Sequence, residues 1–296
     1  MSNIVCFGEV LWDVFPTYKR IGGAPLNVAL RLQSFNNDVT VISAVGEDSE
    51  GNEILSFMKH EGLSLEYIQK VNHPTGKVQV SLDDNGSASY IIVEGAAWDF
   101  IKFEDRMKSI VRNSDVFIFG SLINRNRVSH ETLIKLLKRA PYKVLDINLR
   151  SPYYDTLILK ELLQLTNFLK INEEEYIELF QLLNIEITNV ETDFRVLSRI
   201  YNLDAICMTK GKDGAVLYYK KVFYHSKTIR VDVVDTVGAG DSFLAALLDG
   251  LLKNKPPQEA LRYACVTGAL VASKPGANSK VSNEEIKNSL EFINTN

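Results

Sequence analysis

Residues 231–250 read VDVVDTVGAGDSFLAALLDG, and this stretch decides the fold. The alternating valines at its start are typical of a strand, and Gly238 and Gly240 end that pattern. After Asp241, apolar residues recur at intervals of three and four, the spacing of a helix with one buried face. These residues are Phe243, Leu244, Leu247, Leu248, Leu251 and Leu252. We therefore expect a strand, a glycine turn, and a helix that carries the glycines at its N-terminus.

The expected helix N-terminus is suited to binding an anion. The first amides of a helix have no partners within it and carry the positive end of its dipole. With Gly238, Ala239 and Gly240 in the turn, a charged oxygen can approach the backbone closely. Asp241 repels such an anion unless it is a base for the attacking group, as phosphoryl transfer to an alcohol requires. The alternative is that Asp241 is an ordinary N-cap or first-turn acid.

The composition indicates a globular chain of ordinary charge. The 296 residues are 46% hydrophobic, enough for a substantial core, and the formal net charge is -4. Basic and acidic residues are interleaved, so nucleic acid is not an expected partner. No apolar run approaches the roughly 18 residues of a membrane span, and the N-terminus lacks a signal pattern. We expect a soluble cytoplasmic protein with no membrane partner.

The cysteines and histidines indicate neither a redox site nor a metal site. Cys6, Cys207 and Cys265 are far apart, lie in apolar surroundings and form no CxxC motif, so we expect buried reduced thiols. The four histidines have no metal-ligand spacing, which argues against zinc.

Short apolar runs alternate with helical patterns along most of the chain. This alternation predicts an α/β fold in which helices cover both faces of a mostly parallel sheet, with ligands at the carboxyl ends of the strands. The expected strands are 4–7, 39–45, 116–119, 143–147, 168–171 and 205–208. The expected helices are 26–35, 52–60, 131–138, 157–165, 174–183 and 194–201, followed by 257–272 and 283–293.

One region departs from this alternation. Residues 78–82 and 87–93 read as two strands around the turn Asp83-Asp84-Asn85-Gly86, the signature of a hairpin. With residues 12–21 they could form a small antiparallel sheet. We expect a lid inserted at about 12–22 and 74–98 in a single domain of residues 1–296. Such a sheet can exclude water from a reaction and offers an edge for pairing with a second subunit.

Three positions near the N-terminus are candidates for binding a hydroxylated ligand. Asp13 follows the first strand and can accept hydrogen bonds from paired hydroxyls, as in sugar binding. Gly22 and Gly23 let a ligand touch the backbone, and Asn27 in the next helix offers a donor and an acceptor. The alternatives are a solvated loop acid for Asp13, and a tight turn with a cap for the others.

Two later strand ends carry polar groups suited to phosphate and metal. Asp146, Asn148 and Arg150 share one side of an extended strand, and Arg150 could pair with phosphate oxygens. Asn172 and Glu175 follow the next strand, where an amide and a carboxylate can hold the waters of a magnesium ion. Glutamates also gather at helix starts for dipole reasons alone.

Thr209, Gly211 and Gly214 follow a further strand. A hydroxyl and two glycines there could line the phosphates and base of a nucleotide, although strand-turn-strand connections need glycine anyway. Each motif is weak alone. Their common position at the carboxyl ends of strands supports a single site.

The chain resembles the PfkB carbohydrate kinases, also called the ribokinase family. The two family signatures are matched by GGAPLNVA at residues 22–29 and by DTVGAGDSF at residues 235–243. The resemblance extends over essentially the whole chain. The wording GEVLWD, GGAPLNVA, VEGAAWDF and DINLRSPY is most similar to bacterial fructokinases.

The resemblance implies a ribokinase-like three-layer α/β/α fold with a small β lid, and transfer of the γ-phosphate of ATP to the 6-hydroxyl of fructose. Asp241 would be the base, with the amides of Gly238, Ala239 and Gly240 as anion hole and Arg150 near the transferring phosphate. The remaining roles implied are sugar binding by Asp13, Gly22, Gly23 and Asn27, nucleotide binding by Thr209, Gly211, Gly214 and Asn278, and magnesium organised by Asn172 and Glu175.

Many family members also bind potassium through backbone oxygens, here those near Asp235 and Val237, and a small polar residue. The aligned residue here is Lys280, with Ser279 beside it. A lysine ammonium could take the place of the cation or point to solvent, so potassium dependence is an open question at this stage.

Two other classes of function compete with a fructokinase. The same chemistry could act on ribose, 2-keto-3-deoxygluconate or a nucleoside, and a catalytically silent sugar sensor could share the fold. The intact Asp241 argues against the sensor, which has no need of a base. A dinucleotide-binding oxidoreductase is excluded by position, because Gly8-Glu9-Val10 supplies only one glycine after the first strand.

Overall fold

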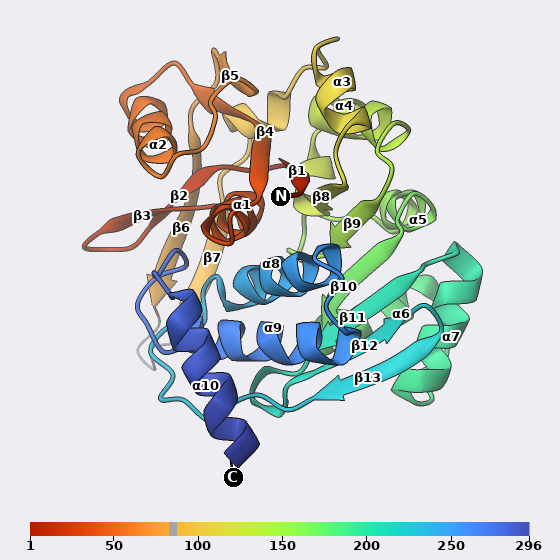
Figure 1. Ribbon diagram of the computed structural model, residues 1–296. Helices are drawn as coiled ribbons and strands as arrows, with labels where there is room; N and C mark the ends of the chain where they lie inside the picture. The colour runs from red at the N-terminus through yellow and green to blue at the C-terminus, as the bar shows by residue number, and fades with distance from the viewer. Residues whose placement is uncertain (83–87, 296) are drawn as a thin grey trace.

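In a computed structural model, the described residues 1–82 and 88–295 form a central sheet with helices on both faces and a second, smaller sheet to one side (Figure 1). The strand order of the main sheet is β13-β12-β11-β10-β9-β8-β1-β4-β5. Pairing is parallel from β11 to β5 and antiparallel at β12 and β13. The expected ribokinase-like α/β fold is therefore confirmed.

The main sheet contains all six strands expected from the apolar runs. Its strands are β1 (Asn3–Phe7), β4 (Asp38–Gly46), β5 (Ile68–Val71), β8 (Val116–Gly120), β9 (Lys143–Asp146), β10 (Phe168–Asn172), β11 (Ala205–Thr209), β12 (Ala215–Tyr219) and β13 (Val222–Ser226).

The helices likewise include every one that the sequence predicts, and their ends differ from the prediction by a few residues. They are α1 (Ala24–Ser34), α2 (Ser49–His60), α3 (Met107–Arg112), α4 (Arg127–Leu137), α5 (Thr156–Gln164), α6 (Glu173–Leu183), α7 (Val190–Tyr201), α8 (Ala239–Leu252), α9 (Pro257–Ala272) and α10 (Asn283–Thr295). Short 3₁₀ turns lie at η1 (Ala97–Phe100), η2 (Leu122–Arg125) and η3 (Gly211–Asp213). None of the helices in the described ranges is both long and apolar enough to cross a bilayer.

The buried side chains divide into two clusters, one on each face of the main sheet. In β8, Phe117 and Phe119 pack with α3 to α7, whereas Val116 and Ile118 pack with α1, α8 and α9. This division follows from the alternation of side chains along a strand. Because both faces are covered, the central strands read as continuous apolar runs.

The smaller sheet is the expected lid, with strand order β3-β2-β6-β7. Its strands are β2 (Leu11–Val14), β3 (Lys19–Gly22), β6 (Gly76–Leu82) and β7 (Ala88–Ile92). The expectation of an antiparallel sheet is wrong in one respect, because β2 pairs with β6 in parallel while both outer pairs are antiparallel. The predicted turn at Asp83-Asp84-Asn85-Gly86 lies outside the described residues.

The strand expected from the valines at 231–234 is absent from the described structure. Val233 and Val234 are 65% and 60% exposed, so the alternation does not mark a buried face here. The amides of Val234 and Asp235 both donate to the carbonyl of Ala272, at 2.9 and 3.1 Å. The segment is thus held by the end of α9 rather than by a neighbouring strand.

Candidate active site

The glycine turn lies at the N-terminus of α8, as predicted. Gly238 is the N-cap residue with φ of 76°, and a Cβ at this position would lie 2.5 Å from the carbonyl oxygen of Ala277. Both features require glycine. Gly240 and Asp241 belong to the first helical turn, whose amides have no partner within the helix. The amide of Ala239, in contrast, donates to the carbonyl of Thr236 at 3.2 Å, so within the described residues only the amides of Gly238 and Gly240 remain free among the predicted three.

Asp241 contacts a second predicted site residue directly. Its Oδ2 accepts a hydrogen bond of 2.8 Å from Nδ2 of Asn27, which α1 brings against α8. Asn27 is 5% exposed, and its Oδ1 has no hydrogen-bond partner in the described part of the chain. Burial, followed by the charge of Asp146, raises the pKa of Asp241 to about 6, while Asn27 and nearby cations oppose the rise. Asp241 is therefore ionised at neutral pH and able to accept a proton.

A buried ion pair lies directly behind the helix tip. The Nζ of Lys170 in β10 lies 3.0 and 3.3 Å from the two carboxylate oxygens of Asp146. The same ammonium would lie 3.3 Å from a Cβ on Gly240, so a side chain there would meet it. Burial alone lowers the pKa of Lys170, but the carboxylates of Asp146, Glu175 and Asp241 outweigh burial and raise it. Lys170 thus adds a fixed positive charge beside the proposed anion hole.

Asp13 lies on lid strand β2, within the expected lid range 12–22, and is half-buried, so it is not the solvated loop acid of the alternative. A Cβ on Gly22 of the paired strand β3 would lie 2.3 Å from Oδ2 of Asp13, so Gly22 makes room for this carboxylate. Burial and the charge of Asp235 raise the pKa of Asp13 to about 6, and Arg150 and Arg20 oppose them. Asp13 thus lies within electrostatic range of the loop that leads into α8.

Gly23 starts the helix that carries Asn27. Its φ is 111°, and a Cβ there would lie 2.4 Å from the carbonyl oxygen of Glu9. The Glu9 side chain follows β1 and is only 3% exposed, with no hydrogen-bond partner for Oε2 among the described residues. Burial raises the pKa of Glu9 to about 7, with Asp241 adding to the rise and Arg150 opposing it. Glu9 is therefore a further acid close to the candidate base.

Arg150 is exposed, and its positive charge lowers the pKa of Glu9, Asp13 and Asp241. This places Arg150 near the predicted base and the predicted sugar-binding acid. The expected extended geometry ends before it, because β9 stops at Asp146 and Asn148 adopts a left-handed conformation with φ of 41°. Asp146 is consequently buried against Lys170 and does not share a face with Arg150.

The predicted nucleotide-binding residues differ in how open they are to a ligand. Gly211 has φ of 52°, and no atom lies within 4 Å of the point that a Cβ would occupy there, so its surface is open to a ligand. Gly214 has φ of 92°, and a Cβ there would lie 1.9 Å from the carbonyl oxygen of Ser226. Glycine at 214, in the β11–β12 connection, is thus explained by its contact with the end of β13 alone. Thr209 ends β11 half-buried, and Asn278 donates from Nδ2 to the carbonyl of Ile21 at 3.3 Å.

Asn172 and Glu175 form a capping box at the start of α6. The side chain of each accepts a hydrogen bond of 2.8 Å from the backbone amide of the other. The second carboxylate oxygen of Glu175 accepts from the amide of Leu149 at 3.2 Å. Each oxygen retains one acceptor position, which suits hydrogen bonds from metal-bound water rather than direct ligation. Across residues 1–82 and 88–295, no group of three or more His, Cys, Asp or Glu side chains could hold a metal ion directly.

The residues expected near a potassium ion are already engaged. The carboxylate of Asp235 accepts from Arg20, from the amide of Gly276 and from the amide of Val237. The carbonyl oxygen of Ser279 accepts a bond of 2.7 Å from Arg31. The side chain of Lys280 is exposed, so it points to solvent and does not take the place of a cation. The bonds at Asp235 involve its carboxylate, so binding of potassium by the backbone oxygens near Asp235 and Val237 stays a prediction.

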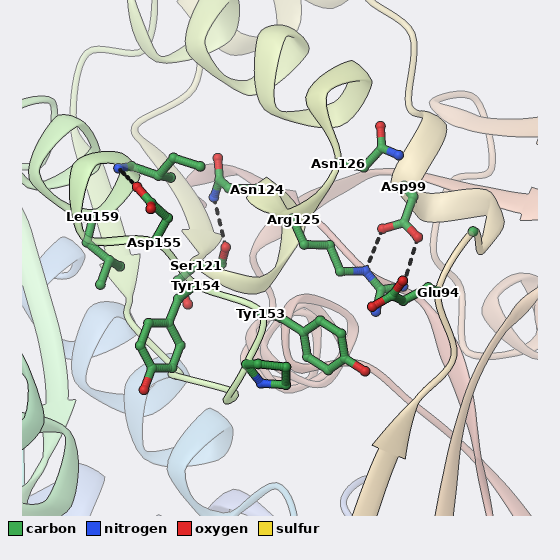
Figure 2. Close-up of a pocket in the computed structure, with 13 residues that line it drawn as sticks. Glu94, Asp99, Ser121, Asn124, Arg125, Asn126, Tyr153, Tyr154, Asp155 and Leu159 are labelled. Carbon is green, nitrogen blue, oxygen red and sulfur yellow. Dashed lines mark hydrogen bonds and ion pairs between the residues drawn. The ribbon is translucent and has the colours of Figure 1, made fainter.

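Besides a cavity of about 620 Å³ that is lined by Asn27, Ser242 and Asn278, two smaller cavities lie beside the lid. A cavity of about 360 Å³ lies between lid strands β2 and β3 and the loops around the α8 tip, and Asp13, Asp235, Val237 and Asn278 line it. A second cavity, of about 340 Å³, lies where β7 returns to the main body (Figure 2). Its lining in the described chain includes none of the predicted site residues.

The polar groups of the second cavity mostly support the fold. Figure 2 shows Arg125 facing Asp99, and both nitrogen–oxygen distances are 2.8 Å. Arg125 also donates to the carbonyl of Val93 at 2.7 Å, at the exit of β7. Asn126 and Asp155 are the N-caps of α4 and α5. This cavity therefore lies at the root of the lid, and its side chains anchor the lid to the body.

A family profile described as "pfkB family carbohydrate kinase" matches residues 1–284. The chain belongs to this family. The known relatives include a probable fructokinase-4 of Arabidopsis thaliana, which is 28% identical over 93% of this chain and 92% of its own length. A putative sugar kinase of Pyrococcus horikoshii is 30% identical over 93% of this chain and 88% of its own length. A ribokinase of Dictyostelium discoideum is 26% identical over 93% of this chain and 96% of its own length.

A solved structure supports the fold of this PfkB kinase. The fructokinase of Xylella fastidiosa with bound ATP superimposes with a TM-score of 0.88 at 21% identity, over 99% of this chain and all of that one. At this identity the likeness shows the fold alone.

Sequence reasoning missed Lys170, Glu9 and Arg20 in this PfkB kinase. Lys170 was the one detectable residue, because a lysine inside the otherwise apolar run 168–171 is unusual for a buried strand and implies an ion partner. Glu9 and Arg20 carry no comparable signal, since acids after strands and basic residues on exposed strands are common.

Proposed function

We propose that this PfkB carbohydrate kinase is an ATP-dependent fructokinase that phosphorylates the 6-hydroxyl of fructose. The observation that carries the proposal is the contact between Asn27 and Asp241 at the first turn of α8, beside the free amides of the glycine turn. This contact brings together the proposed base Asp241, the helix tip that would bind the phosphate, and Asn27, a proposed sugar-binding residue. Fructose is favoured over other sugars by the similarity to proteins named as fructokinases.

In the proposed reaction, Asp241 takes the proton of the sugar hydroxyl while the hydroxyl oxygen attacks the γ-phosphorus of ATP. The bond from the γ-phosphorus to the bridging oxygen breaks, and ADP leaves with the electron pair. A carboxylate with a pKa of about 6 is ionised at pH 7 and can accept the proton. Because this pKa is close to the pH, the carboxyl group can also release the proton after the reaction. Replacing such a base lowers turnover by about 10²- to 10⁴-fold.

The amides of Gly238 and Gly240 would stabilise the charge on the transferring phosphoryl group. These donors and the helix dipole are fixed before the reaction, which is the condition for electrostatic stabilisation of a transition state. The ammonium of Lys170, paired with Asp146, lies behind the same tip, and Arg150 approaches from the side of β9. Together, the two amides and the two cationic side chains would stabilise the phosphate charges of ATP when the phosphates bind near Asp241.

The acceptor sugar would bind between the lid and α1. Asp13 offers two carboxylate oxygens to paired hydroxyls, Asn27 retains a free and buried Oδ1, and Gly22 and Gly23 keep the backbone accessible. A phosphorylated sugar would face the negative charge of Asp13, so we propose a neutral sugar as the acceptor.

We propose that ATP binds with Mg²⁺ on the opposite side of the α8 tip, along Thr209, Gly211 and Gly214, with Asn278 nearby. Magnesium would neutralise the phosphate charges, and Asn172 and Glu175 would hold it through its waters. Because such a kinase needs ATP, the cytoplasm is its proposed location. We also propose that the lid sheet pairs with a second copy of the chain to give a homodimer.

The spread of relatives supports one alternative, a kinase of the same fold for another acceptor. A ribokinase is 26% identical to this chain, and kinases for aminoimidazole riboside and 2-dehydro-3-deoxygluconate share its fold. A catalytically silent sensor has less support, because the base and the glycine turn are both in place.

A coupled assay of ADP release across D-fructose, D-ribose, 2-keto-3-deoxygluconate and a nucleoside tests the proposal. We expect D-fructose to give the highest kcat/KM and a product that carries phosphate on O6. A preference of tenfold or more for another acceptor would replace fructose, and no turnover with any acceptor would favour the sensor.

A further inference from the structure

Arg20 places a positive charge beside the turn that precedes α8. Its Nη1 lies 3.1 Å from Oδ2 of Asp235, although the two residues are 215 positions apart in the sequence. Arg20 belongs to lid strand β3, whereas Asp235 belongs to the loop that leads into the helix. The ion pair therefore joins the lid to the anion-binding turn, and both residues line the 360 Å³ cavity.

The carboxylate of Asp235 organises the turn itself. Its Oδ1 accepts from the amide of Val237 at 3.0 Å, and its Oδ2 accepts from the amide of Gly276 at 2.9 Å. A Cβ on Gly276 would lie 3.1 Å from Nη1 of Arg20, and φ at this residue is 86°. Glycine at 276 thus leaves room for the guanidinium group. One carboxylate connects the lid, the turn and the loop at 276.

A second bond fastens the same strand to the same loop. Asn278 donates to the carbonyl of Ile21, the residue after Arg20. One residue earlier in the loop, Ala277 packs against Gly238, with its carbonyl oxygen where a Cβ of Gly238 would be. The loop 276–278 therefore lies between lid strand β3 and the glycine that caps α8. This loop therefore contacts both the lid strand and the helix tip.

The charge of Arg20 also matters for phosphate binding. The carboxylate of Asp235 lies three residues before the N-cap, and uncompensated it would repel an incoming phosphate. The guanidinium group cancels this charge at hydrogen-bonding distance. The ring of Tyr18 supports it, with the guanidinium carbon 4.8 Å from the ring centroid.

We propose that Arg20 is a positioning residue for phosphoryl transfer: it holds Asp235 and the glycine turn in place from the lid, and it neutralises the charge of Asp235 so that no bound potassium ion is needed there. The inference rests on the kinase activity but not on the identity of the acceptor sugar. It predicts that the enzyme has no requirement for a monovalent cation.

The test compares Arg20→Gln with Lys19→Gln in the full-length protein. Lys19 is a matched control, because it is the neighbouring residue, its side chain is 37% exposed against 38% for Arg20, and it lines the same cavity but pairs with Glu53 of α2 instead of Asp235. Steady-state ADP release is measured in potassium chloride and in tetramethylammonium chloride at equal ionic strength. The sugar used is whichever one the wild type turns over fastest, so a preference for an acceptor other than fructose leaves the comparison valid.

We expect Arg20→Gln to lower kcat by about 10- to 100-fold with a small change in the KM for sugar, since the loss is one of positioning. Lys19→Gln should retain kcat, and Arg20→Lys should recover most of it because the charge is kept. The wild type should be equally active in both salts. A kcat for Arg20→Gln within twofold of the Lys19→Gln value, or a wild type that is active only in potassium, would overturn the proposal.

A double-mutant cycle tests whether Arg20 acts through Asp235. If it does, Arg20→Gln combined with Asp235→Asn should lose no more activity than the worse single variant. Multiplicative losses would show that the two residues act independently and would contradict the proposed route. Thermal unfolding of each variant, followed by circular dichroism, separates loss of positioning from loss of the folded state.

Discussion

Replacing Lys170 by Met tests the buried charges behind the α8 tip. The side chains of Lys170 and Asp146 are 9% and 6% exposed, and two nitrogen–oxygen distances of 3.0 and 3.3 Å join them. Removing one partner of a buried pair leaves an uncompensated charge and costs about 3–5 kcal/mol. Because domains are stable by about 5–15 kcal/mol, this loss is a large fraction of the total free energy of unfolding.

Urea unfolding followed by circular dichroism measures the effect. Lys59→Met is a suitable control, because Lys59 is exposed at the end of α2 and should change stability by less than about 0.5 kcal/mol. The double variant Lys170→Met with Asp146→Leu should recover most of the loss, since neither buried charge remains. A single variant within about 1 kcal/mol of the wild type, or a double variant no more stable than the single one, would refute this reasoning.

The same variants should shift the pH dependence of the reaction. The charge of Asp146 raises the pKa of Asp241 and the charge of Lys170 lowers it, and the pKa of Asp241 in the wild type is about 6. Activity requires ionised Asp241, so kcat/KM falls as pH falls through this pKa. Lys170→Met should move the acid limb to higher pH, and the double variant should move it back. An unchanged acid limb in the single variant contradicts the assigned base.

Three further predictions concern stability and assembly. Gly214→Ala should destabilise the protein by about 3 kcal/mol or more in urea unfolding, because of the clash with Ser226, whereas Gly211→Ala should cost only about 1–2 kcal/mol; equal costs would contradict the assigned packing. Asp241→Asn should raise the free energy of unfolding by about 1–2 kcal/mol at pH 8, because the raised pKa means that ionised Asp241 is unfavourable in the folded state. This gain should vanish as pH falls below about 4, and a gain that does not depend on pH would refute this cause. Ile91→Lys, on edge strand β7 where Ile91 is 58% exposed, should abolish the proposed dimer in sedimentation equilibrium, and a wild-type monomer would dismiss the dimer outright.

The parts of the fold that depend on buried periodicity could be predicted from the sequence. The helix expected after Asp241 is present as α8, but it is buried at every residue from Ser242 to Gly250 between α1 and α9 and not on one face alone. Strand β8 is apolar throughout because helices cover both of its faces. The strand expected at 231–234 shows the limit of this method. Among the described residues these valines have no neighbouring strand to pair with, and only the tertiary structure reveals that the carbonyl of Ala272 accepts hydrogen bonds from the amides of Val234 and Asp235.

The candidate site was predictable where a residue type is constrained by local geometry. Gly238 has a positive φ at a helix N-cap, and glycine is favoured there because it has no Cβ to clash in this conformation. Long-range pairings were not predictable. Nothing near Arg20 in the sequence indicates Asp235, and nothing near Lys170 indicates Asp146, because each pair is formed by folding.

The central claim is that Asp241 is the base that activates the sugar hydroxyl at the α8 tip. The most direct measurement is single-turnover phosphoryl transfer by Asp241→Asn, with sugar affinity determined separately by calorimetry. We predict a rate lower by about 10²- to 10⁴-fold while the Kd for the sugar changes less than about threefold. A variant that transfers phosphate at a rate near that of the wild type would show that another group removes the proton.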